Sequence, residues 1–103
     1  MKSLFIAPNE GIYVIDLETR NDVHEMLGSF DIVDLGSDLM MAVNGLGIPI
    51  LTPNHRATLL IASLFNVIIP IFGNALLFMN TDEDLDLKAL PEWVQHAIAA
   101  PFN

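Results

Sequence analysis

The sequence has 103 residues, the length of one domain with one hydrophobic core. Its 13 acidic and 4 basic residues give a formal net charge of −9, which repels nucleic-acid phosphates and anionic membranes and attracts basic protein surfaces. It contains no cysteine, which excludes disulfides and thiolate chemistry and fits a reducing compartment. The first apolar run stops at Pro8, too early for a signal peptide. We therefore expect a cytoplasmic protein that does not bind nucleic acid directly.

The first part of the chain alternates short apolar runs with turn-forming residues. Apolar runs at 4–7 and 12–17 flank the turn sequence Pro-Asn-Glu-Gly and predict a β-hairpin. Residues 19–28 carry apolar side chains at helical spacing and end at a glycine, which predicts a short helix. Alternating polarity at 30–35 predicts a half-buried strand, and an apolar run at 39–43 predicts another.

Two dipeptides carry turn signals in the middle of the chain. Asn44-Gly45 is the strongest of them, and we expect it to lead into a short strand at 48–51. Pro49 would place that strand at the edge of a sheet. Gly73-Asn74 is the second signal. Both dipeptides are therefore expected to form turns between strands.

The stretch from Leu59 to Met79 has no charged side chain and is long enough to cross a bilayer. Asn66, Pro70 and Asn74 interrupt it with polar amides and a missing backbone donor, and no cluster of basic residues anchors it. We therefore expect the core of a soluble domain and no contact with a membrane, with an anchor at 59–79 as the alternative.

The region that contains this stretch divides into separate elements. Residues 55–65 predict a helix with Asn54 as its N-cap. The β-branched residues at 67–71 indicate a short strand or an extended connector, and residues 75–79 predict a buried strand.

The C-terminal part contains an acidic loop at 81–84 and a final amphipathic helix that begins near Pro91 and stops before Pro101. The predicted order is β-β-α-β-β-β-α-β-α, without internal repeats or a linker. It indicates one α+β domain over residues 1–103, with a small mixed, mainly antiparallel sheet packed with about three helices.

Polar and turn-forming residues concentrate between positions 44 and 58. The start of the predicted helix offers free amide donors and the positive end of the helix dipole, which could hold an anion. The simpler interpretation, which the residue types favour, is that the first of these residues caps the helix while the next two face water. The candidate ligand-binding residues are Asn44, Asn54, His55, Arg56 and Thr58.

The spacing of reactive residues indicates no catalytic centre and no metal site. His24, His55 and His96 lie in three different predicted elements, and none is followed three or four residues later by a second ligand. The acidic runs lack the spacing of a calcium loop, and the serines lack the context of a nucleophile elbow. We therefore expect a protein that is not an enzyme and uses no cofactor and no metal.

Several short motifs follow one another in an order that resembles a known family. They are the run LGSFDIVDLGSDLMMAVNGLGIPI from Leu27, then PNHRAT, then IFGNALLF, then an acidic stretch and a final helix. The layout is similar to that of a family of small uncharacterised proteins from bacteriophages and mobile elements, a domain of unknown function. The resemblance implies a phage-like origin and the cytoplasm of the host cell, and it supplies no activity or catalytic residue.

Composition and resemblance together lead to two functional hypotheses. The first is a small acidic phage-type accessory protein that binds a host protein without catalysis and forms a homo-oligomer, since 52% hydrophobic residues exceed what one small core can hide. The alternative is a small-molecule or nucleotide-like ligand binder, or sponge, that uses the helix start from Asn54 to Thr58. A hydrolase would need a carboxylate to converge with a histidine, which sequence spacing does not show.

Overall fold

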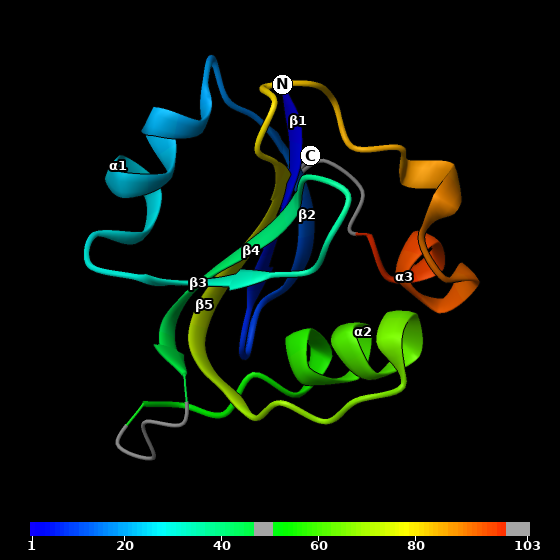
Figure 1. The fold of residues 1–103 in the computed structure, drawn as a ribbon. Coiled ribbons are helices and arrows are strands. Elements are labelled where there is room, and N and C mark those ends of the chain that lie inside the picture. Colours follow the sequence, from blue (N-terminus) through cyan, green and yellow to red (C-terminus); the bar gives the residue numbers. More distant parts are fainter. Residues whose placement is uncertain (47–50, 99–103) are drawn as a thin grey trace.

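The computed structural model describes residues 1–46 and 51–98. They form three layers, with a five-stranded sheet in the middle, one short helix on one face and two helices on the other (Figure 1). The named strands all pair in antiparallel fashion, and an isolated parallel bridge joins Ile98 to Ile12. The predicted α+β class is therefore confirmed.

The sheet has the strand order β2-β1-β5-β4-β3, so the last strand in the chain lies at its centre. The first two strands form the predicted hairpin, with Leu4 opposite Val14. The central strand is buried on both faces, which explains why Ala75 to Phe78 form a continuous apolar run. The strands are β1 (Lys2–Ala7), β2 (Gly11–Asp16), β3 (Asp31–Asp34), β4 (Leu39–Leu46) and β5 (Ile71–Met79).

Helices cover the two faces of the sheet unequally. The helix α2 begins and ends at the predicted residues, because the Asn54 side chain caps its start and Asn66, with a φ of 54°, ends it in the left-handed conformation. The predicted helix at 19–28 is a 3₁₀ turn followed by a short α-helix. The helical elements are η1 (Arg20–Asp22), α1 (Val23–Leu27), α2 (His55–Phe65), η2 (Leu87–Ala89) and α3 (Glu92–Ala97).

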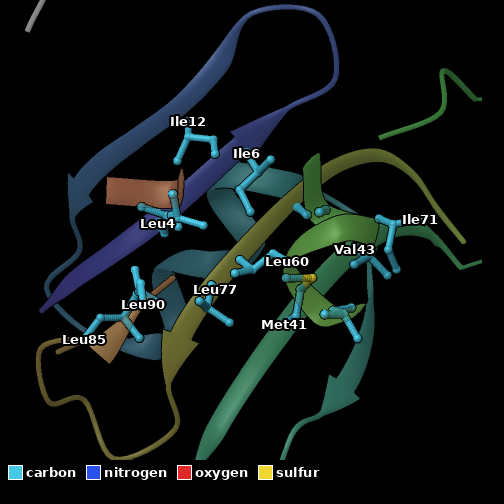
Figure 2. Close-up of a cluster of buried hydrophobic side chains, with 14 residues drawn as sticks. Leu4, Ile6, Ile12, Met41, Val43, Leu60, Ile71, Leu77, Leu85 and Leu90 are labelled. Atoms are coloured by element: carbon cyan, nitrogen blue, oxygen red, sulfur yellow. The ribbon is translucent and has the colours of Figure 1, made fainter. Parts of the chain in front are cut away.

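The main hydrophobic core lies between the sheet and the pair α2 and α3. Figure 2 shows its side chains converging from the sheet and from α2, with Leu85 and Leu90 joining them from the C-terminal part of the chain. A smaller core on the other face packs α1 against the sheet through Val23, Leu27 and Leu76. The periodicity of α2 and of the strands therefore places apolar side chains inward as expected.

Both predicted turn dipeptides lie inside strands, which corrects the prediction. Asn44-Gly45 belongs to β4 and Gly73-Asn74 belongs to β5. The pairing of Val43 with Ala75 is followed by that of Gly45 with Phe72, so Asn44 alone lies opposite two residues of β5. This β-bulge uses the glycine of the second dipeptide, whose φ is 76°. Pairing between distant strands therefore overrides the local turn preference.

Two other expectations concern the chain around α2. Residues 48–50 of the predicted strand at 48–51 lie outside the described residues. Residues 67–70 belong to no helix or strand, in keeping with the predicted connector, but Ile71 of the same predicted stretch begins β5, so the strand predicted at 75–79 starts four residues earlier. The apolar stretch at 59–79 is thus shared between a helix, a connector and a strand, and none of the helices in the described ranges has the length and apolar character to cross a membrane.

Candidate functional site

Asn54, the first of the predicted site residues, is fully buried and joins three parts of the fold. Its Nδ2 donates to the carbonyl oxygens of Ile6, at 2.9 Å, and Gly73, at 2.8 Å. Its Oδ1 accepts from the backbone N–H of Ala57 at 3.1 Å. The amide group is therefore committed to linking the start of α2 to β1 and β5, which is a structural role.

Asn44 and Thr58 also direct their polar atoms to backbone partners. The Nδ2 of Asn44 donates to the carbonyl oxygens of Leu27, at 2.8 Å, and Ser29, at 3.2 Å, while its Oδ1 accepts from the N–H of Asn74 at 3.1 Å. The Oγ1 of Thr58 accepts from the N–H of Ile71 at 3.0 Å. The Asn44 contacts therefore link the end of α1 to the bulge, and the Thr58 contact links α2 to the start of β5.

His55 and Arg56, by contrast, are exposed in the first turn of α2. The structure therefore separates the five candidates into two groups. Asn44, Asn54 and Thr58 direct their polar atoms to backbone groups, whereas the histidine and the arginine face water.

A polar pocket of about 330 Å³ adjoins the bulge. It contains Asn44 but neither His55 nor Arg56, and among the described residues that line it only Glu10 is charged, with a sign that repels an anion. The pocket therefore lacks the positive group that the predicted anion site needs. Its lining residues are Ala7, Pro8, Asn9, Glu10, Asn44, Leu51, Thr52, Gly73 and Asn74.

The three histidines lie in three different helices, α1, α2 and α3. The His24 ring packs edge-on against Phe30 with 5.6 Å between ring centroids. His96 lies 3.7 Å from a carboxylate oxygen of Glu92 on the exposed side of α3. Within residues 1–46 and 51–98, no three histidine or carboxylate side chains gather in a group that could hold a metal ion.

Acidic side chains gather in a depression between the end of β2 and α1. Part of this charge serves local structure, since the Asp22 carboxylate accepts from the N–H groups of Glu18 and Thr19, and Asp16 pairs with the N-terminal amine at 3.0 Å. The lining residues are Asp16, Leu17, Glu18, Asp22, Glu25 and Met26. The depression adds to the negative charge of the surface, and its described residues form no group of three that could hold a metal ion.

An apolar groove, which the sequence did not predict, opens on the face of the sheet that carries α2. It has a volume of about 300 Å³ and lies between the last turn of α2, the turn joining β3 to β4, and the segment around η2. Leucine, phenylalanine and methionine side chains dominate its walls. The residues of this apolar groove are Leu35, Gly36, Ser37, Leu39, Leu64, Phe65, Met79, Leu85, Asp86, Ala89 and Leu90.

Three exposed apolar side chains lie at the end of α2 and in the residues that follow it. Phe65 is 42% exposed, Val67 is 44% exposed and Ile68 is 77% exposed. We call these residues the apolar tip, and Phe65 belongs to both the tip and the groove. The signal in the sequence was the continuation of large apolar residues past Asn66, the residue that ends α2.

Comparison with family models, with curated proteins and with solved structures finds no match for this chain. The resemblance to the phage family therefore stays an expectation. The geometry of the apolar groove and the apolar tip supplies the functional argument.

Proposed function

We propose that this chain is a small, non-enzymatic binding protein that acts by holding another protein on its apolar groove and apolar tip. The observation that carries the proposal is the exposure of large apolar side chains at and just after the end of α2, where Phe65 lines the groove and Ile68, three residues later, is 77% exposed. Exposed apolar surface of this kind is typical of interaction sites, because a partner that covers it removes it from water.

The hydrogen bonds that the polar candidate residues make within the chain support the same proposal. Side-chain polar atoms of three candidates, Asn44, Asn54 and Thr58, form hydrogen bonds with backbone groups of the chain. In the alternative ligand site at 54–58, His55 and Arg56 are therefore the side chains left to contact a ligand. If the phage resemblance is correct, the partner is a host protein met in the host cytoplasm. A second copy of the chain is the other protein that could cover the surface.

The test is retention of a partner by matched surface variants. The tagged chain would be purified from host cells together with the double variant Phe65→Ser/Ile68→Ser and the control Leu59→Ser. Leu59 is a suitable control because it is 52% exposed on α2 and lies outside both the groove and the tip. We expect the wild type and the control to retain one protein in stoichiometric amount and the double variant to lose it.

Equal retention by all three proteins would overturn the proposed surface. A small bound mass in native mass spectrometry that disappears in Arg56→Ala would overturn the proposal in favour of the ligand binder. Sedimentation identifies the case in which the retained protein is a second copy, since the wild type and the control would then be oligomers and the double variant a monomer.

A further inference from the structure

We infer that the occupant of the apolar groove is a basic amphipathic helix of a partner protein, whose apolar face enters the groove and whose lysines or arginines face the acidic residues around it. This inference rests on the proposed function, because it specifies the partner of that same surface. Three properties of the groove support it: its apolar lining, the negative charge around it, and the hydrogen bonds that its backbone N–H groups already make within the chain.

The charge around the groove is predominantly negative. Asp86 lines it, and Asp34, Asp38 and Asp84 adjoin lining residues in the chain; all four are exposed. Lys88, also exposed, is the one basic residue in an equivalent position. Lys2 also lies nearby, since its carbonyl oxygen accepts from the N–H of Leu85 at 3.0 Å. Four carboxylates and two lysines therefore belong to the segments around the groove, and a basic partner complements this excess of negative charge.

The negative charge also separates the candidate occupants. A second copy of the chain would bring another −9 and the same acidic residues to the interface, so Coulomb repulsion opposes it. An anionic membrane surface is repelled for the same reason. A basic segment is attracted both by the residues around the groove and by the net charge of the whole chain.

The backbone of the groove indicates that the occupant is helical. The N–H groups of Leu35, Leu39, Leu85, Ala89 and Leu90 all donate to carbonyl oxygens within the chain, at 2.9 to 3.3 Å. These five backbone donors of the groove are therefore not free to pair with an added strand. A helix satisfies its own backbone and needs only an apolar surface, so it suits this groove better than an extended peptide does.

The probe is a synthetic peptide of about 16 residues with leucines at helical spacing and lysines elsewhere. Its binding to the full chain would be measured by calorimetry. Two control peptides isolate the requirements: one replaces every lysine with glutamate, and the other has the same composition with leucine and lysine alternating. We expect the first peptide to bind at least about tenfold more tightly than either control.

Two charge-matched variants locate the site. Asp34→Asn/Asp38→Asn/Asp86→Asn removes three charges near the groove, and asparagine still offers the oxygen that accepts from Gly36 or Lys88. The control Asp16→Asn/Glu18→Gln/Glu25→Gln removes three charges from the acidic depression. Both variants have the same net charge, so only the position of the lost charges differs. We expect about a tenfold loss of affinity for the first and less than a threefold loss for the second.

Each other outcome overturns the inference. Equal losses in both variants would mean that the peptide responds to net charge and not to the groove. Equal affinity for the lysine and glutamate peptides would show that the occupant need not be basic. Equal affinity for the peptides with helical and alternating leucine spacing would show that it need not be helical. None of these results affects the proposed function, because the retention experiment with Phe65→Ser/Ile68→Ser tests that separately.

Discussion

The two ends of α2 use their side chains in opposite ways. At its start, Asn54 and Thr58 direct polar atoms toward backbone groups of distant strands. At its end, Phe65 and the neighbouring Ile68 expose apolar carbon to water. The polar end links α2 to β1 and β5, and the apolar end is the surface that we propose for a partner.

This difference shows why residue type alone misplaces a site. A buried polar atom without a partner costs about 1–3 kcal/mol, so a polar side chain at a buried helix start is used within the fold. When a partner covers an exposed apolar side chain, the free energy falls by about 25 cal/mol for each Å² of apolar area that is removed from water. Ser3 departs from the first rule, since its hydroxyl is buried without a hydrogen-bond partner among the described residues. Among the large apolar residues that the structure describes, Ile68, just after the end of α2, is the most exposed at 77%.

Replacement of Asn54 by alanine should have the largest effect on stability. The change removes the cap of α2 and leaves the carbonyl oxygens of Ile6 and Gly73 without the amide donor. We expect the free energy of unfolding to fall by about 3–5 kcal/mol, measured by urea denaturation. His55→Ala, next to it and exposed, is the control and should change the value by less than about 0.5 kcal/mol. A loss below about 1 kcal/mol for the Asn54 variant would show that the hydrogen bonds of this side chain to β1, β5 and α2 contribute little to stability.

Gly73→Ala should have the second largest effect and tests the β-bulge. The glycine has a φ of 76°, and an added Cβ would lie 2.9 Å from the Cβ of Asn44. Strain and close contact together should cost about 2–4 kcal/mol. Gly36→Ala is the matched control, because its φ is 84° but nothing lies within 4 Å of the added carbon. It should cost about 1 kcal/mol, and the difference between the two variants measures the close approach of β4 and β5.

Equal costs for the two glycine variants would mean that the contact at Asn44 relaxes. The bulge would then depend on the backbone conformation of Gly73 alone. The hydrogen bond from Asn74 to the Asn44 side chain would no longer indicate a tightly packed bulge.

Local signals in the sequence were sufficient for most elements. The cap at Asn54 and the apolar spacing after it predicted α2 to the residue, because both signals act within one helical turn. The hairpin of β1 and β2 was predicted for the same reason, since its strands are neighbours in the chain. The α+β class followed from the order of such elements.

Signals between distant segments were not available in the sequence. The dipeptides at 44–45 and 73–74 have the composition of turns, yet Asn44 lies opposite Gly73 and Asn74, about 30 positions away, and the two strands form a bulge there. The apolar groove is another example, because its walls come from residues 35–39, 64–65, 79 and 85–90. No spacing rule connects four segments of this kind. The site prediction therefore selected the polar segment that is contiguous in the chain.

Ile68→Ser should have the smallest effect on stability. The side chain is 77% exposed, so we expect the free energy of unfolding to change by less than about 0.5 kcal/mol. Leu60→Ala, at a fully buried position of α2, should cost about 2–5 kcal/mol in the same urea denaturation experiment. If Ile68→Ser instead cost more than about 1 kcal/mol, the tip would belong to the folded core. If the Ile68→Ser change destabilised the chain, loss of a partner in the double variant would reflect a weakened fold. If the chain stays stable, the same loss shows that the partner binds the surface that contains Ile68.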